Sequence, residues 1–129
     1  MSWVSDIKRM HQKFEMTEVF ENFNSEEKRQ FLEFRADFIQ EELDELKSQM
    51  DNPEEVVDAL IDICVVAIGT LDAYGIDSKR AWKEVLKANL AKEPGIKEGR
   101  PNPLGLPDLM KPEGWVAPDH TGNHGRLEG

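Results

Sequence analysis

The sequence has 129 residues, enough for one domain built around a single hydrophobic core. Its 26 acidic and 16 basic side chains give a formal net charge of −10, which argues against a nucleic-acid backbone or an anionic membrane as the main partner. The single cysteine, Cys64, excludes a disulfide framework, so we expect a reducing, cytoplasmic location. No apolar run approaches the ~20 residues that span a bilayer, and the first ten residues lack a signal-peptide core.

The first predicted helix covers residues 5–14, with Ser5 as its N-cap and an apolar face that includes Ile7 and His11. His11 has two interpretations. It is either a packed, hydrogen-bonded residue of the core or a side chain that stacks on a substrate base. Residues 15–24 have no clear period, so we expect a connection there with a helical turn at most.

The second predicted helix begins at Ser25 and ends between residues 47 and 50. Near its end the segment QEELDEL places Glu42 and Glu45 three residues apart, and Glu41 and Glu45 four residues apart. Carboxylates at these spacings share one face of a helix. Taken alone, the pattern is also typical of a solvated acidic surface.

The third predicted helix runs from Asn52, a suitable N-cap, to Gly75, a suitable left-handed stop, with a proline at its first position. It is apolar nearly all round, which indicates a helix buried at the centre of a bundle. Glu55, Asp58 and Asp62 nevertheless lie along one stripe of this helix. Unpaired buried carboxylates cost several kcal/mol each, so we expect a cation to meet them.

A turn at residues 48–52 predicts that these two long helices are antiparallel neighbours. Carboxylates from both helices then converge on one point: Glu42, Glu45, Glu55 and Asp58. Oxygen donors of this kind suit a hard divalent cation, Mg²⁺ or Mn²⁺. Asp62, one turn deeper, is a candidate ligand for an additional ion or for a ligand-bound water.

The fourth predicted helix covers residues 78–92. Asn89 interrupts its apolar stripe, and its role is either structural hydrogen bonding or contact with a substrate or a metal-bound water. Lys92, one turn further on, is the lysine of this helix that we assign to substrate binding. Lys83 and Lys87 are predicted to lie on a solvated face.

From Pro94 onward the composition changes to six prolines and seven glycines in 36 residues, without a helical period. We therefore predict a helical domain at residues 1–95 and an extended tail at residues 96–129. Large apolar side chains, among them Trp115, predict that residues 96–119 lie over the helices or a partner subunit. Lys97 and Arg100 are the basic residues that this tail could bring near an acidic site. The final ten residues are predicted to be disordered.

These elements predict an all-α fold, a bundle of about four helices with an extended Pro/Gly-rich tail. The third helix carries apolar side chains on nearly every side, and three short companions from one chain do not cover them. We therefore expect oligomerisation, at least to a homodimer, to complete the bundle.

The two acidic motifs together resemble the signature of the MazG-like all-α NTP pyrophosphatase superfamily, including its phage-type and phosphoribosyl-ATP-pyrophosphohydrolase-like members. The segment EEVVDALIDICVVAIGTLDAYGID is similar to the third helix of these proteins, KANLAK to their Asn-x-x-Lys element, and KPEGWVAPD to their C-terminal segment. The resemblance covers roughly residues 30–119. The gap from Glu45 to Glu55 is shorter than in many members, and Asp62 stands where several of them lack an acid.

The resemblance implies hydrolysis of a nucleoside triphosphate to its monophosphate and pyrophosphate, with Mg²⁺ or Mn²⁺ held by the converging carboxylates. It also implies homodimers or homotetramers. Glu41 is then the candidate to orient or deprotonate the attacking water. Some phage relatives act on dGTP, so a purine deoxynucleotide is the expected substrate, although no residue here has a signature for the base.

Two alternatives stay open at this point. One is a phosphoribosyl-ATP pyrophosphohydrolase of histidine synthesis, within the same superfamily. The other is a non-enzymatic helical oligomer whose acidic side chains bind divalent ions or stabilise helix ends.

Overall fold

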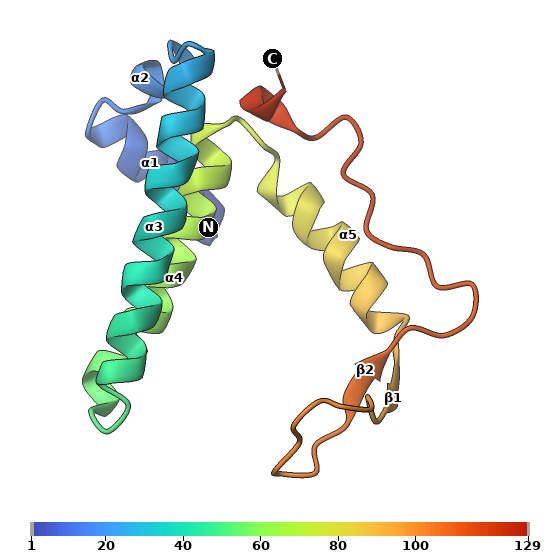
Figure 1. Ribbon diagram of the computed structural model, residues 1–129. Coiled ribbons are helices and arrows are strands. Elements are labelled where there is room, and N and C mark those ends of the chain that lie inside the picture. Colours follow the sequence, from blue (N-terminus) through green and yellow to red (C-terminus); the bar gives the residue numbers. More distant parts are fainter. Residues whose placement is uncertain (1, 129) are drawn as a thin grey trace. The chain divides into compact units, whose positions relative to one another are not determined.

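The computed structural model describes residues 2–128, which are mostly helical, as predicted for an all-α fold (Figure 1). The helices in chain order are α1 (Trp3–Lys13), α2 (Thr17–Glu21), α3 (Ser25–Ser48), α4 (Pro53–Ala73) and α5 (Ser78–Leu90). Two short strands, β1 (Glu93–Gly95) and β2 (Asp108–Met110), and a 3₁₀ turn, η1 (Gly125–Leu127), follow. None of the described helices is both long and apolar enough to cross a membrane.

The chain forms two compact units. The first contains residues up to Ser78 together with those from Gly122 onward, and the second is Lys79–Thr121. The domain at residues 1–95 and the tail at residues 96–129 stay a prediction, while α5 lies in the same compact unit as the segment that follows it. The physical reason is a contact within the second unit: the indole of Trp115 donates a hydrogen bond from Nε1 to the carbonyl of Ala88 on α5, at 2.7 Å.

The N-cap of α1 differs from the expected one, whereas α3 begins at Ser25 as predicted. Ser2, rather than Ser5, caps α1, and the two serines bond reciprocally to each other's backbone N–H groups. Asn24 caps α3 by accepting the N–H of Glu27 at 2.8 Å, while the Glu27 carboxylate accepts the N–H of Asn24 at 3.0 Å. Both arrangements satisfy backbone donors that have no partner inside a helix.

The ends of α4 are the predicted ones. The Asn52 side chain accepts the N–H of Glu55, and a proline occupies the first turn. Gly75 follows the helix with a φ of +72°, a left-handed conformation that glycine adopts without steric cost.

The C-terminal segment of the first unit is held against the end of α4. The Asn123 side chain bonds both the N–H and the carbonyl of Asp77, each at 2.9 Å, and Arg126 donates to the carbonyl of Ala73 at 2.5 Å. We expected residues 120–129 to be disordered, whereas these contacts order residues 123–126. The bonds connect distant parts of the chain, so local composition does not reveal them.

The core of the first unit is aromatic. Phe20 of α2, Phe31 of α3 and Tyr74, which directly follows α4, lie together, with ring centroids 5.3 Å apart for the first pair and 5.9 Å for Phe31 and Tyr74. The Tyr74 hydroxyl donates to the carbonyl of Lys28, and burial raises the pKa of Tyr74. These contacts fix α3 and α4 side by side (Figure 1).

Helix α4 is less buried than expected. Its buried positions are Ala59, Val66, Gly69 and Ala73. Val57 is 62% exposed, Leu60 48% and Ile61 45%. Within one chain, therefore, α3 and α1 cover only part of the apolar surface of α4.

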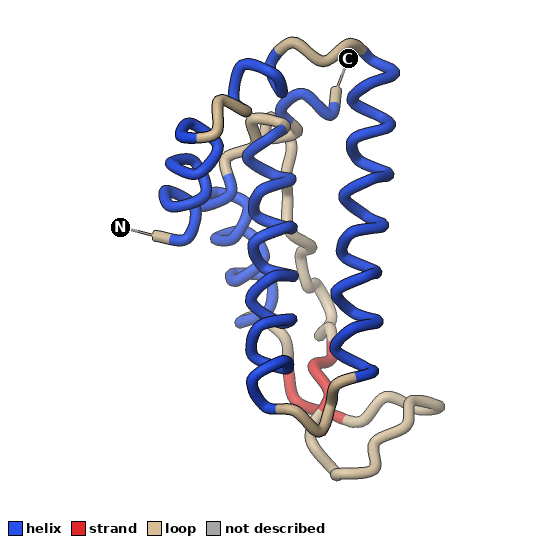
Figure 2. The backbone as a smooth tube through the Cα atoms, turned by 90° about the vertical axis from the view of Figure 1, so that its left-hand side faces the viewer, coloured by secondary structure: helices blue, strands red, loops and turns tan. Residues whose placement is uncertain are grey.

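In the second unit β1 and β2 pair antiparallel, with Glu93 opposite Met110 and Gly95 opposite Asp108. Figure 2 shows that most of the chain after these strands and between them is loop. Asp108 organises the loop between the strands, since it accepts the backbone N–H of Lys97 at 2.9 Å and pairs with Arg100 at 3.3 Å.

Candidate active site

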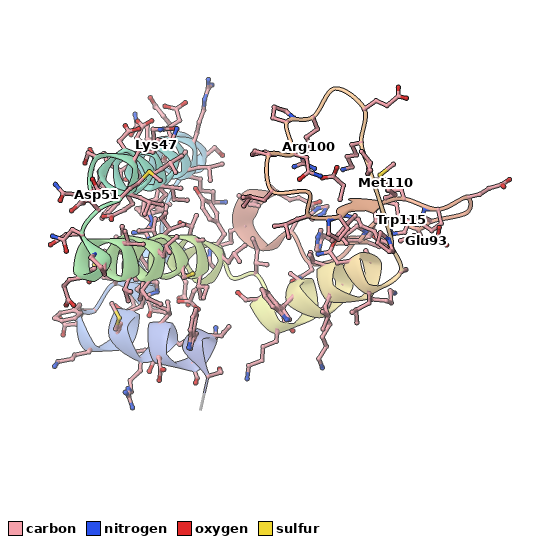
Figure 3. All side chains as sticks on the ribbon, turned by 90° about the horizontal axis from the view of Figure 1, so that it is seen from below. Lys47, Asp51, Glu93, Arg100, Met110 and Trp115 are labelled. Atoms are coloured by element: carbon pink, nitrogen blue, oxygen red, sulfur yellow. The ribbon has the colours of Figure 1, made fainter. Side chains whose placement is uncertain are left out.

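The candidate site lies between α3 and α4, which a short turn joins as antiparallel neighbours. Figure 3 labels Lys47 near the end of α3 and Asp51 in that turn. The turn is closed by backbone hydrogen bonds from Gln49 to Leu46 and from Asn52 to Gln49. The last turns of α3 and the first turns of α4 therefore lie beside each other, as the sequence predicted.

Arg35 fixes the register between the two helices. Its Nε donates to Thr70 Oγ1 at 2.9 Å and its Nη2 donates to the carbonyl of Val66 at 3.0 Å. The guanidinium carbon lies 5.6 Å from the ring centroid of Phe31 and 5.9 Å from that of Phe38. Burial lowers the pKa of Arg35. The side chain thus joins α3 to α4 through hydrogen bonds to uncharged acceptors.

This register brings Glu42 of α3 to the acidic stripe of α4. Glu42 is half-buried, and its Oε2 atom is inaccessible and accepts no hydrogen bond from any described residue. Burial raises the pKa of Glu42 first, and the negative charges of Asp62, Glu45, Asp58 and Glu41 raise it further. The structure therefore brings four other predicted carboxylates near Glu42.

Glu55 is the predicted ligand that the structure does not add to this group. It is half-buried in the first turn of α4, where its N–H bonds to Asn52. Its charge is not among those that raise the pKa of Glu42. Glu55 consequently remains a ligand by prediction alone.

The chemistry of the carboxylates fits a divalent cation, although their positions are not those of a formed coordination shell. Within residues 2–128, no three Asp, Glu, His or Cys side chains are gathered closely enough to hold a metal ion. A buried carboxylate oxygen without a donor, surrounded by four other negative charges, is nevertheless costly unless a cation meets it.

His11 lies away from this acidic group. Its Nδ1 is 2.6 Å from Asp72 Oδ2, and its ring packs edge-on against Phe20 with centroids 4.9 Å apart. Asp72 also accepts from Lys8 at 2.8 Å. Ten residues separate Asp62 from Asp72 on α4, roughly 15 Å along a helix. His11 therefore has the packed, hydrogen-bonded role, and it anchors α1 to α4.

Asp72 is a charged residue that the sequence argument missed. Burial by itself would raise the pKa of Asp72, but hydrogen bonds from Lys8 and His11, together with their charges, lower it. In the sequence, Asp72 could have been noticed as a further acidic residue on the apolar helix, beyond the stripe that ends at Asp62. Arg35 was missed as well, and its signal was a cation on the apolar stripe of α3 between Phe31 and Phe38.

The remaining predicted substrate-binding residues lie in the second unit. Asn89 is exposed near the end of α5, and Lys92 places its ammonium group 5.4 Å from the ring centroid of Trp115. Arg100 is paired with Asp108, and the backbone of Lys97 bonds the same carboxylate. Arg100 and Lys97 thus stabilise the loop between the strands through Asp108.

Comparison with known protein families matches residues 7–89 to the family described as PRA-PH, phosphoribosyl-ATP pyrophosphohydrolase. The match includes both acidic motifs, His11 and Asn89, and it ends before Lys92 and the tail. A search of curated proteins finds no matching sequence. Because the match covers more than half of the chain, it decides against the non-enzymatic alternative. The chain belongs to the phosphoribosyl-ATP pyrophosphohydrolase family within the MazG-like all-α superfamily, and it is a nucleotide pyrophosphohydrolase.

Proposed function

We propose that the substrate is a nucleoside triphosphate, with a purine deoxynucleotide such as dGTP as the first candidate, and that the reaction requires Mg²⁺ or Mn²⁺. The observation that supports this proposal is the buried, unpaired Glu42 Oε2 among four further carboxylates. Such a group of carboxylates suits a divalent cation, which prefers oxygen ligands. The cation would also offset the repulsion between this acidic protein and a negatively charged triphosphate.

The proposed metal ligands are Glu42, Glu45, Glu55, Asp58 and Asp62. When bound, the metal neutralises phosphate charge and lowers the pKa of a water molecule. Glu41, on the same turn of α3, orients that water and takes its proton. The water oxygen attacks the α-phosphorus, the bond from that phosphorus to the bridging oxygen breaks, and pyrophosphate leaves with the electron pair. No serine or cysteine nucleophile is needed.

Substrate contacts are proposed for Asn89, Lys92, Lys97 and Arg100, which offer an amide and three cations. His11 was a further candidate, but its contacts with Asp72 and Phe20 favour the anchoring role. Nothing in these residues distinguishes one base from another.

Phosphoribosyl-ATP is the second candidate substrate, because the matching family carries its name. It contains the same α–β phosphoanhydride, so the same carboxylates serve both reactions. The two substrates differ in their base and in an added ribose phosphate, which need binding groups that the acidic site does not supply.

A nucleotide panel tests the proposal. The purified chain is incubated with dGTP, dATP, GTP, ATP and phosphoribosyl-ATP in Mg²⁺ or Mn²⁺, and products are separated by ion-exchange chromatography. We expect monophosphate and pyrophosphate, with dGTP turned over fastest, and no reaction in EDTA. Faster turnover of phosphoribosyl-ATP favours the second candidate, whereas diphosphate and orthophosphate as products would contradict cleavage between the α- and β-phosphates.

A homodimer or homotetramer in the cytoplasm is part of the proposal. Support comes from exposed apolar side chains on α4 and from an open groove of about 210 Å³ between α1 and α4, lined by Trp3, Met10, Ile61 and Cys64 among others. Multi-angle light scattering at micromolar concentration tests this part. A monomer there would contradict it.

A further inference from the structure

Two lysines of the second unit, Lys92 and Lys111, make cation–π contacts with the indole ring of Trp115. The ammonium group of Lys111 lies 5.0 Å from the ring centroid and that of Lys92 lies 5.4 Å from it. The indole itself is fixed, because its Nε1 donates to the carbonyl of Ala88 and its backbone N–H bonds Pro112. Figure 3 labels Trp115 near the strand residues Glu93 and Met110, which are the chain neighbours of the two lysines. We call Lys92, Lys111 and Trp115 the Trp115 cluster.

The two lysines have no carboxylate partner. Among the described residues, no Asp or Glu oxygen lies within salt-bridge distance of either ammonium group. Two carboxylates of this unit pair with other cations, Asp108 with Arg100 and Glu84 with Lys87. Cation–π attraction at exposed sites is worth about 0.5–1 kcal/mol, so it positions the ammonium groups without neutralising them.

Charge is also distributed unevenly along the chain. Residues 79–121 contain eight Lys and Arg and six Asp and Glu, a formal charge of +2, whereas the whole chain carries −10. The Trp115 cluster thus lies in the basic unit of an acidic protein. Electrostatic attraction of an anion is favourable in this unit and unfavourable over the rest of the sequence.

We propose that the Trp115 cluster is a binding site for a polyphosphate anion, with Lys92 and Lys111 as its two cationic ligands. The ammonium groups lie 5.4 and 5.0 Å from one ring centroid, which limits their separation to about 10 Å, and in the proposed site one pyrophosphate group bridges them. Lysine binds phosphate as a compact point charge with three donors. Trp115 acts as the fixed platform that sets the two lysines. The identification of this anion with the polyphosphate of the substrate or product rests on the proposed function, whereas the anion site itself does not.

Fluorescence of Trp115 provides the test. Trp3 and Trp82 are 58% and 69% exposed, so we expect the variant Trp3→Phe/Trp82→Phe of the full chain to fold, and it leaves Trp115 as the single tryptophan, excited apart from Tyr74 at long wavelength. Inorganic pyrophosphate is titrated in EDTA at low ionic strength, which removes metal-dependent binding and turnover. We expect a saturable change in Trp115 emission, and orthophosphate to bind about tenfold more weakly because it bridges the two lysines less well.

Substitutions then test whether Lys92 and Lys111 bind the pyrophosphate. In the single-tryptophan background, Lys92→Gln and Lys111→Gln each raise the Kd for pyrophosphate by about tenfold, whereas Lys111→Arg retains binding. Lys83→Gln is the matched control, because Lys83 is an exposed lysine of α5 without a contact to Trp115. It leaves the Kd within about twofold. Far-UV circular dichroism verifies that each variant is folded.

The inference is overturned if pyrophosphate causes no saturable change, or if Lys83→Gln weakens binding as much as Lys92→Gln does. Equal affinities for orthophosphate and pyrophosphate would also overturn it as a polyphosphate site. These outcomes are separate from failure of the proposed function. A chain that binds pyrophosphate here but hydrolyses no nucleotide refutes only the proposed function, and the reverse result refutes only this inference.

Discussion

Gly69 makes room for the guanidinium that joins α3 to α4, so Gly69→Ala is a sharp test of how the site is held. A Cβ at this position would lie 2.7 Å from Arg35 Nη2 and 3.6 Å from His11 Nε2. The first distance is too short for a carbon–nitrogen contact. Arg35 must therefore move away from the Val66 carbonyl, to which Nη2 donates.

Two opposing terms set the size of the effect. Loss of one hydrogen bond from a charged donor costs about 1.5–3 kcal/mol. Alanine in place of glycine within a helix stabilises by about 1 kcal/mol. The net loss of unfolding free energy is then roughly 0.5–2 kcal/mol, which corresponds to a melting temperature lower by roughly 2–8 °C in a chain of this size.

A double-mutant cycle separates these terms. Urea denaturation is measured for the wild type, Gly69→Ala, Arg35→Met and the double variant. In the Arg35→Met background the guanidinium is gone, so Gly69→Ala should be neutral or stabilising. If Gly69→Ala instead stabilises the wild type by the full helix-propensity gain, Arg35 has moved without cost and does not lock the two helices.

Three further predictions concern charge. Asp72→Asn should lower the unfolding free energy by about 1–3 kcal/mol at neutral pH, because the amide removes the negative charge and leaves one acceptor oxygen for Lys8 and His11 in place of two. The pKa of Asp72 is lowered in the folded state, so this stabilisation is complete above the unfolded pKa of about 3.9 and is lost as the pH falls through the folded pKa. A difference in unfolding free energy between wild type and Asp72→Asn that stays the same at all pH values, measured by urea denaturation, would contradict this. Asp62→Asn should reduce metal affinity and turnover together while leaving the metal-free melting temperature unchanged or higher, whereas a lower melting temperature with hydrolysis intact at saturating Mg²⁺ would remove Asp62 from the ligands. Millimolar Mg²⁺ should raise the melting temperature of the wild type by mass action, and an unchanged melting curve would argue against a metal site in the native state.

Local signals predicted the long helices well. Asn52 and Gly75 marked the ends of α4, and the short turn after α3 correctly predicted the antiparallel pair that brings Glu42 to Asp58 and Asp62. These features depend on caps, period and loop length, which are written in neighbouring residues. Much of the candidate site followed from them, because helix geometry places residues three and four apart on one face.

Contacts between distant residues were not predictable in the same way. The pairing of His11 with Asp72, the hydrogen bonds of Arg35 to α4 and the attachment of Asn123 to Asp77 each join segments more than 30 residues apart. Such pairs depend on how helices pack, which no local pattern encodes. Helix α2 has five residues, too few to establish a period, so the sequence predicted no more than a helical turn in that connection.

Binding of Mn²⁺ to wild type and Glu42→Gln, measured by electron paramagnetic resonance alongside turnover, tests the metal site most directly. An amide keeps the shape of the side chain but removes the charge, so we expect Glu42→Gln to lose at least about tenfold in Mn²⁺ affinity and nearly all pyrophosphate release. Asp44→Asn is the matched control, since Asp44 is an exposed acid of the same helix that Gln40 hydrogen-bonds at 2.9 Å, and it should keep both. Wild-type Mn²⁺ affinity and turnover in Glu42→Gln would contradict the assignment of the active site to the carboxylates between α3 and α4.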